Sequence, residues 1–380
     1  MKFVLFYHSL VSDWNHGNAH FLRGIAAELQ ARGHEIHAYE PDDAWSVAQL
    51  TKEHGQAPID EWQCRFPQLR SRRYGLETLD LDRVLDGADA ALVHEWNEPA
   101  LVAAVGAHAP AECRAFFHDT HHRSVSAPEE MARYDLRGYD GVLAFGEAIR
   151  RRYLERGWCE RAWTWHEAAD VRVFRPLAAE KTGDLVWIGN WGDDERAAEL
   201  REFLVEPVHA LGISARVHGV RYPAGALALL ADAGIEYRGW LPNHRAPEVF
   251  GAHRATVHVP RRPYVRMLPG IPTIRVFEAL ACGIPLVSAP WTDAEGLFSP
   301  GRDFLVAADG ARMRQQLRAV LDDPAMASEI AAHGLATIHA RHTCGHRVDE
   351  LLAILSALDG TAETGAAGHS TSTTRSVSHA

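Results

Sequence analysis

Short apolar strands that alternate with helices fill most of the sequence, in two successive series. The first series places its strands at Lys2–His8, His34–Tyr39, Ala88–His94, Arg114–His118, Gly141–Phe145 and Ala162–His166. The second series places them at Leu185–Ile188, Ala215–His218, Glu236–Trp240, Ala255–Val259 and Pro285–Ala289. Strands separated by helices in this way form parallel sheets that helices cover on both faces. The pattern therefore predicts an α/β protein.

The two series are similar in size, which predicts two Rossmann-like domains that face each other across a cleft. Between them, Asp170–Lys181 contains a proline, small residues and charges, as interdomain linkers do. We place the first domain at residues 1–172, the linker at 173–183 and the second domain at 184–359. Residues 360–380 are rich in Ser, Thr, Gly and Ala, and we expect them to form a disordered tail.

The overall composition argues against several classes of protein. The 380 residues include 39 basic and 50 acidic side chains, and the net charge of −11 argues against a nucleic-acid binder, which needs clustered positive charge. The five cysteines are widely spaced and form no Cys-x-x-Cys pair, so neither a disulfide framework nor a cysteine zinc site is expected. No apolar stretch approaches the ~18 residues of a membrane span. We expect a cytoplasmic protein.

Ligands of open α/β sheets bind at the carboxyl ends of the strands, so polar residues just after predicted strands are candidates for a site. The first group follows the strand Lys2–His8 and leads into a helix; it comprises Asn15, His16, Gly17, Asn18 and His20. Glycine allows close approach of a ligand to the backbone, and a helix N-terminus favours anionic or polar ligand groups. The alternative is a loop in which Asn15 or Asn18 only caps the helix.

A second group follows the strand Arg114–His118, where the sequence continues His118, Asp119, Thr120, His121, His122. Three histidines and an aspartate suggest zinc or iron ligands. Neighbouring side chains of an extended chain point to opposite faces, however, and do not converge on one ion. We therefore expect no metal here and expect His118, with Asp119 beside it, to be presented to a substrate in the cleft. A metal site and a purely structural role remain the alternatives.

The third and fourth groups lie in the second domain. Asn190 and Arg196 follow the strand Leu185–Ile188, and Arg196 is placed to make bidentate contacts with a phosphate, unless it forms an ion pair with Glu199 or Asp193.

The fourth group is a predicted helix over Thr273–Cys282, whose first amides, at Thr273 and Ile274, are free to bind phosphate. Inside it, Glu278 lies among apolar residues and needs a partner. The vicinal hydroxyls of a sugar would satisfy both carboxylate oxygens; the alternative is an ion pair with Arg275, three residues earlier.

The segment FEALACGIPLVS, residues 277–288, resembles the nucleotide-sugar segment of retaining GT-B glycosyltransferases of the family 4 group. Within that group it is most similar to the branch with spore-maturation (CgeB-like) C-terminal domains. Three further pieces agree in order along the chain: the glycine-bearing loop after the first strand, Asp170 with Phe174 and Pro176, and Gly239–Leu241.

The resemblance implies a GT-B fold and transfer of a sugar, with retention and as a hexosyltransferase, from a nucleoside diphosphate donor on the second domain to an acceptor on the first. It implies no cofactor and no obligatory metal. In the donor site, Glu278 would bind the ribose, Arg196 and the amides at Thr273 and Ile274 the diphosphate, and Trp240 and Leu241 would lie beside the base. His118 would contact the donor sugar, and the Gly17 loop the diphosphate or the acceptor.

Two departures from the family pattern affect this interpretation. Gly270 stands where the family has a first glutamate, and no lysine follows Lys181, so Arg266 or Arg275 is expected to replace the family's phosphate-binding lysine. The alternatives are an epimerase or phosphorylase on the same architecture, or a nucleotide-sugar-binding protein without catalysis.

Overall fold

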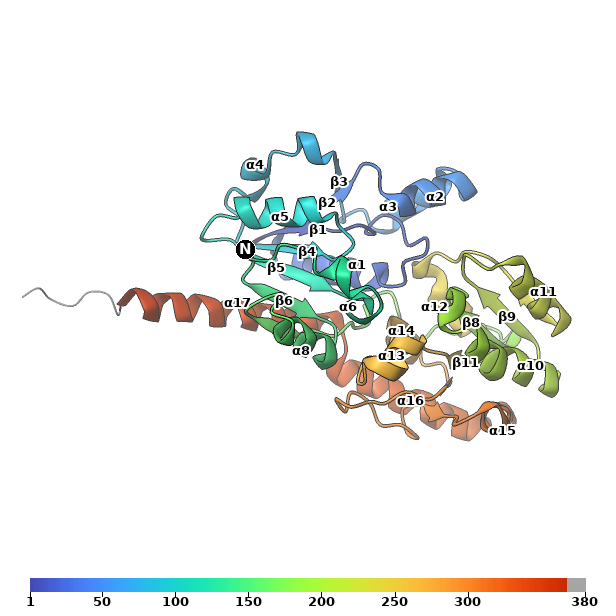
Figure 1. The fold of residues 1–380 in the computed structure, drawn as a ribbon. Coiled ribbons are helices and arrows are strands. Elements are labelled where there is room, and N and C mark those ends of the chain that lie inside the picture. Colours follow the sequence, from blue (N-terminus) through green and yellow to red (C-terminus); the bar gives the residue numbers. More distant parts are fainter. Residues whose placement is uncertain (368–380) are drawn as a thin grey trace, which may run out of the picture.

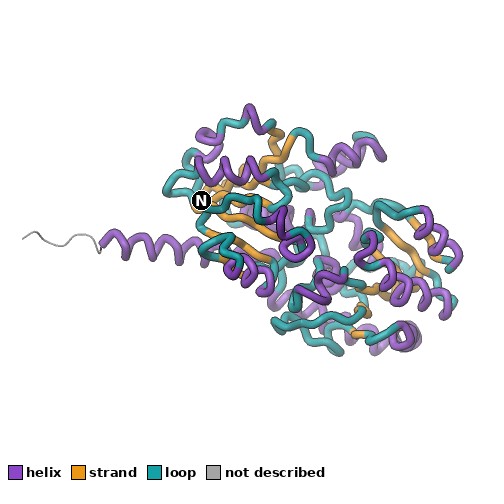
Figure 2. Tube along the Cα trace, in the orientation of Figure 1, coloured by secondary structure: helices purple, strands orange, loops and turns teal. Residues whose placement is uncertain are grey.

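The computed structural model describes residues 1–367 and contains two α/β domains, each with one parallel sheet (Figure 1). The strands form the inner layers and helices lie on both sides of them (Figure 2). The sequence prediction of two Rossmann-like domains is therefore confirmed. In the described part of the chain, no helix combines the length and the apolar character needed to cross a bilayer.

The sheet of the first domain has the order β3-β2-β1-β4-β5-β6-β7. Its strands are β1 (Lys2–Phe6), β2 (Glu35–Pro41), β3 (Ser71–Tyr74), β4 (Ala90–His94), β5 (Arg114–Asp119), β6 (Gly141–Ala144) and β7 (Ala162–Thr164). Its helices are α1 (Ala19–Ala31), α2 (Trp45–His54), α3 (Ala57–Arg65), α4 (Leu81–Leu85), α5 (Pro99–His108), α6 (Arg123–Ser126), α7 (Pro128–Met131) and α8 (Glu147–Glu155). The central order is that of a Rossmann sheet, in which the crossover direction reverses beside β1.

The sheet of the second domain repeats this order, as β10-β9-β8-β11-β12-β13. Its strands are β8 (Gly183–Ile188), β9 (Ala215–His218), β10 (Ile235–Tyr237), β11 (His253–His258), β12 (Leu286–Ser288) and β13 (Leu305–Val306). Its helices are α9 (Ala197–Leu200), α10 (Glu206–Leu211), α11 (Ala224–Asp232), α12 (Ala246–Gly251), α13 (Arg262–Met267), α14 (Ile274–Ala281), α15 (Gly310–Asp322) and α16 (Pro324–Arg341). The edge strands β3 and β13 were not predicted, because each is short and mostly not fully buried.

The helical segment between β8 and β9 is not one regular α-helix. After α9, residues Arg201–Val205 form a π-helical turn before α10 begins at Glu206. Pro207 explains the break, because proline has no N–H to donate to the preceding turn.

The last helix, α17 (Cys344–Ala367), returns to the first domain and packs on α1 (Figure 1). Val348, Leu351 and Leu355 of this helix are buried in a core that also contains residues of both domains. The residue range 184–359 predicted for the second domain thus includes a helix that lies on the first. The predicted tail begins inside α17, since residues 360–367 are helical; residues 368–380 lie outside the described part of the chain.

Candidate functional site

The carboxyl ends of both sheets face a single cavity of about 720 Å³ between the domains. The first-domain wall comes from segments at the ends of β1 to β7, and the second-domain wall from segments after β8, β9 and β11 and from the start of α14. Of the predicted site residues, the cavity is lined by Asn15, His16, Asn18, Asn190, Arg196, Thr273, Ile274 and Arg275. Polar residues at the carboxyl ends of the strands therefore line this cavity.

Arg196 of the second-domain wall is a buried cation that has no carboxylate partner in the described part of the chain. Its side chain is only 8% exposed, lies over the Trp187 ring at 5.1 Å, and donates to the backbone carbonyls of Val259 (3.2 Å) and Asn190. Among the described residues it forms no ion pair, and the alternative partner Glu199 instead binds Arg262. Burial, followed by the charge of Arg261, lowers the pKa of Arg196 to about 9. A buried guanidinium of this kind favours an anionic ligand.

Two more arginines stand beside Arg196. Arg261 contacts Glu195 at 2.5 Å, and Arg275 pairs with Glu278. Arg266, which we expected to bind phosphate, is exposed on α13 and does not line the cavity, because Pro263 and Tyr264 form the buried face of that helix. The expectation for Arg275 is consistent with its place in the wall.

The start of α14 faces a carboxyl group that sequence analysis did not select. Glu167 follows β7, is buried, lines the cavity and accepts a hydrogen bond from the Ile274 N–H. Burial, and next the charge of Glu278, raise the pKa of Glu167 to about 8, so it is mostly protonated at neutral pH. An acid with so perturbed a pKa in a cleft is a candidate for proton transfer or for hydrogen bonding to an anion. Its place just after a predicted strand was the only signal in the sequence.

Glu278 does not reach the cavity in this structure. It is fully buried in α14, where one oxygen is 3.1 Å from His20 Nδ1 and the other binds Arg275. The ion pair with Arg275, the alternative to ribose binding, is thus observed. His20, expected in the ligand-binding loop, is buried as well; its Nε2 accepts a hydrogen bond from the Asp170 N–H (2.8 Å), and its ring stacks on Phe174. Both groups hold the domains together rather than line the site.

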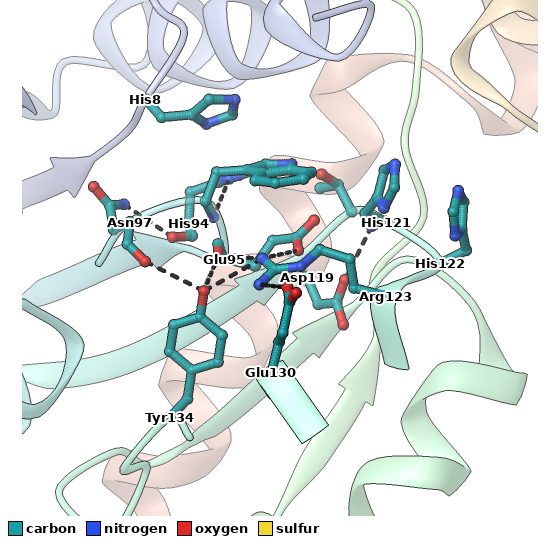
Figure 3. Close-up of polar contacts among 12 residues, drawn as sticks. His8, His94, Glu95, Asn97, Asp119, His121, His122, Arg123, Glu130 and Tyr134 are labelled. Carbon is teal, nitrogen blue, oxygen red and sulfur yellow. Dashed lines mark hydrogen bonds and ion pairs between the residues drawn. The ribbon is translucent and has the colours of Figure 1, made fainter. Parts of the chain in front are cut away.

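The first-domain wall carries three neutral imidazoles, from His8, His16 and His121, and the fully buried His94 packs against His8 with ring centroids 4.6 Å apart. His8 Nε2 lies 3.1 Å from His16 Nδ1, and His94 Nε2 lies 2.9 Å from the Thr120 hydroxyl. Burial lowers the pKa of all four, that of His16 to about 4. Figure 3 shows His8, His94 and His121 at the ends of neighbouring strands. Neutral imidazoles can accept a proton from a hydroxyl group, the role of a general base.

His118 and Asp119 lie beneath this wall and not in it. His118 is fully buried between the rings of Trp165 (4.8 Å) and His94, and neither of its ring nitrogens has a hydrogen-bond partner among the described residues. The strand β5 continues through Asp119, so the side chains that reach the cavity are those of Thr120 and His121. The expectation that His118 faces the substrate is therefore not met.

Asp119 has a positioning role in the structure. Its carboxylate accepts hydrogen bonds from the Tyr153 hydroxyl (2.8 Å) and from the His121 N–H (2.9 Å), and burial raises its pKa to about 6. It thereby fixes the backbone that presents His121 to the cavity. The described residues include no group of three or more His, Cys, Asp or Glu side chains that could hold a metal ion.

The loop before α1 crosses from the first domain to the second. Asp13 accepts hydrogen bonds from Trp240 Nε1 and from the Asn243 N–H, both at 3.0 Å, and Asn15 Oδ1 accepts one from Asn190 at 2.6 Å. The Gly17 carbonyl accepts a fourth hydrogen bond, from Asn243 Nδ2 at 3.0 Å. Trp240 and Leu241, expected beside a base, line only a small cavity of about 30 Å³ next to this loop.

Comparison with known proteins agrees with this geometry. Residues 196–353 match a family model described as glycosyl transferase-like. This segment carries Arg196, Arg261 and the start of α14. None of the curated proteins matches the chain.

Solved structures of several glycosyltransferases have a similar arrangement of both domains. A sucrose-phosphate synthase from Thermosynechococcus elongatus has a TM-score of 0.66 at 14% identity, over 94% of this chain and 100% of that one. HepE from Anabaena, solved with UDP and glucose, has a TM-score of 0.64 at 14% identity, with coverage of 94% and 100%. An α-glucosyltransferase solved with UDP-glucose and DNA has a TM-score of 0.68 at 10% identity, with coverage of 93% and 99%. The chain has the GT-B fold.

Proposed function

We propose that this protein transfers a sugar from a nucleoside diphosphate sugar, bound on the second-domain wall, to an acceptor hydroxyl bound on the first-domain wall. The observation that carries the proposal is Arg196, a buried guanidinium that has no carboxylate partner among the described residues and that lines the cavity within the segment matching glycosyl transferase-like proteins. Two similar structures contain UDP with glucose or UDP-glucose, which supports a nucleotide-sugar donor.

In this proposal the bond between the anomeric carbon and the diphosphate oxygen breaks, and negative charge develops on the leaving diphosphate. Arg196, Arg261, Arg275 and the first amides of α14 stabilise that charge electrostatically. A neutral imidazole of the first-domain wall is available for the proton of the attacking hydroxyl. We further propose, from the likeness of FEALACGIPLVS to family 4, that the anomeric configuration is retained and that no metal is required.

The first test is stabilisation of the full chain against heat by UDP, GDP, ADP and TDP and their sugar conjugates, with EDTA present. At a hundred times the dissociation constant, binding adds about 2.7 kcal/mol to the free energy of unfolding. We expect one base to raise the melting temperature and Arg196→Lys to reduce that rise, because lysine cannot reproduce the fork of guanidinium donors. Arg201→Lys, an exposed change in the same segment, is the matched control. If none of the nucleotides has an effect, the proposal is wrong.

Once the base is known, the same donor can be offered with a panel of acceptors. Retention is read from the anomeric proton coupling of the product by NMR, and metal independence from equal rates with and without EDTA. An inverted product or complete dependence on added metal would contradict those two parts of the proposal and leave sugar transfer itself standing.

A further inference from the structure

The two walls of the cavity differ in charge. The arginines that line it, Arg196, Arg221, Arg261 and Arg275, all belong to the second domain. The described first-domain residues that line it include Asp42, Asp43 and Glu98 but neither lysine nor arginine. A ligand with an anionic group is therefore attracted to one wall and repelled by the other.

The acidic groups of the first-domain wall are not neutralised by the protein. Asp42, Asp43 and Glu98 are exposed, and none of them forms an ion pair with any residue of the described chain. The imidazoles of His8, His16 and His121 on the same wall offer no countercharge at neutral pH, because burial lowers their pKa. This half of the cavity thus has no positive group to bind a phosphate or a carboxylate.

Two tryptophans of this wall are unusually exposed for residues of their size. Trp45 is 48% exposed and Trp96 is 40% exposed, both line the cavity, and their rings lie 6.4 Å and 6.3 Å from the ring of His16. Exposed aromatic rings at a cavity mark a binding surface. Flat indole faces pack well against the C–H faces of a sugar ring, which combine apolar area with hydroxyl groups at the edge.

Trp96 is held in place from behind. The Arg123 guanidinium lies over its ring at 4.6 Å. Figure 3 shows Arg123 fixed in turn by Glu95, Glu130 and Tyr134, at 3.3, 3.2 and 3.3 Å. The orientation of Trp96 is therefore built into the fold and does not depend on a ligand.

One buried polar atom of the wall also lacks a partner. His8 is 8% exposed, it lines the cavity, and its Nδ1 has no hydrogen bond among the described residues. A buried polar atom without a bond costs free energy, and a ligand hydroxyl can supply the missing bond in either tautomer of the ring.

From these observations we propose that the acceptor is a sugar or sugar-like polyol without phosphate or carboxylate groups, stacked on Trp45 and Trp96 and bonded through its hydroxyls to Asp42, Asp43, Glu98 and His8. This inference rests on the proposed function for the assignment of the two walls. It names the class of acceptor that this chain selects.

The test measures binding of matched sugars to the full chain by saturation-transfer NMR and calorimetry, with and without UDP. The pairs are glucose with glucose 6-phosphate and fructose with fructose 6-phosphate; maltose, cellobiose, glucosamine and glucuronic acid complete the panel. We expect each phosphorylated sugar, and glucuronic acid, to bind about tenfold or more weakly than its uncharged parent, because like charges meet at this wall. Tighter binding of glucosamine than of glucose would identify an amine-bearing acceptor within the same class.

Variants of the first-domain wall test whether the sugars bind at this site. Trp45→Ala and Trp96→Ala should each weaken the uncharged sugars at least about fivefold, whereas Met267→Ala, an exposed apolar control outside the cavity, should not. The triple change Asp42→Asn, Asp43→Asn, Glu98→Gln should reduce the discrimination between each sugar and its phosphate. Equal or tighter binding of the phosphorylated member, or no binding by any sugar of the panel, overturns the inference.

The measurements with UDP distinguish a failure of this inference from a failure of the proposed function. If UDP fails to stabilise the protein while the uncharged sugars still bind in a tryptophan-dependent manner, the donor assignment has failed and the ligand class of the first-domain wall stands. If UDP binds and the phosphorylated sugars are preferred, the donor assignment stands and the acceptor class is wrong.

Discussion

If a base binds beside Trp240, as the sequence resemblance implies, the loop before α1 competes with it for that space, and Asn15→Gly measures the competition. In the structure Asn15 Oδ1 accepts a hydrogen bond from Asn190 at 2.6 Å, and Asn15 itself has a left-handed backbone with φ of 63°. Glycine adopts this backbone freely, so the change removes the hydrogen bond without distorting the loop. The free space beside Trp240 is about 30 Å³, room for one or two water molecules and not for a base.

The expected magnitude follows from the single bond that is lost. A hydrogen bond of this kind contributes about 1 kcal/mol net, so its removal shifts the equilibrium between the closed and the nucleotide-accepting forms by about fivefold. If the closed form dominates without ligand, the apparent dissociation constant of UDP falls by up to that factor. Asn15 would then oppose nucleotide binding, although it lines the cavity.

Calorimetric titration with UDP, or with the base selected by thermal stabilisation, is the assay. Asn190→Ala serves in a double-mutant cycle: once Asn15 is glycine, the cross-domain bond is gone and the second change should bring no further gain from this source. Weaker UDP binding by Asn15→Gly would refute the reasoning, because it would mean that the amide holds the diphosphate, as the sequence analysis expected for this loop.

Three further predictions follow from buried groups. The unchanged protein should bind UDP more weakly as the pH rises through about 8, because the Glu167 carboxyl group beside the first amides of α14 loses its proton and begins to repel phosphate. Glu167→Gln should remove this pH dependence. Titrations with UDP across this range check the prediction, and parallel curves for both proteins would contradict it. His118→Phe should leave thermal stability unchanged or higher and the sugar-transfer rate intact, because both ring nitrogens are unpartnered among the described residues and the surroundings are aromatic; a folded variant without activity would return His118 to catalysis. Glu278→Ala should cost roughly 3 kcal/mol or more in urea unfolding, because it leaves His20 and the Arg275 guanidinium without their carboxylate, and an unchanged midpoint would show that the pair contributes little.

Much of the fold was predictable because parallel strands that helices cover on both faces are continuous apolar runs, as in Val4, Leu5 and Phe6. Such runs identify central strands and leave edge strands unmarked. In β3 only Tyr74 is fully buried and β13 has only two residues, so neither has an apolar run to detect. The return of the final helix α17 to α1 is a long-range contact that no local pattern encodes.

The position of the cavity at the strand ends was predictable, and whether several of the named residues face it was not. The ends of predicted strands locate the cavity, yet whether a side chain there faces it depends on the last residue of the strand. Extension of β5 by one residue, to Asp119, places His118 in the core and leaves Thr120 and His121 at the surface of the cavity. For Glu278 the deciding factor was a partner 258 positions away in the sequence, His20, which no spacing reveals.

Gly270, at the position where the family that the sequence resembles has a glutamate, has a structural reason to be glycine. It has φ of 93°, a left-handed conformation that favours glycine, and a Cβ at this position would lie 2.8 Å from Glu295 Oε1. Glu295 accepts hydrogen bonds from the Glu147 N–H at the start of α8 (3.0 Å) and from His166 Nε2 (2.8 Å), both in the first domain. The missing side chain therefore makes room for a carboxylate that joins the domains behind the cavity. A glutamate at residue 270 would have a strained backbone and would clash with Glu295. It would therefore weaken the hydrogen bonds from Glu295 to the first domain. The glycine is thus required by the closed arrangement of the two domains, and its presence does not by itself argue for a loss of catalysis.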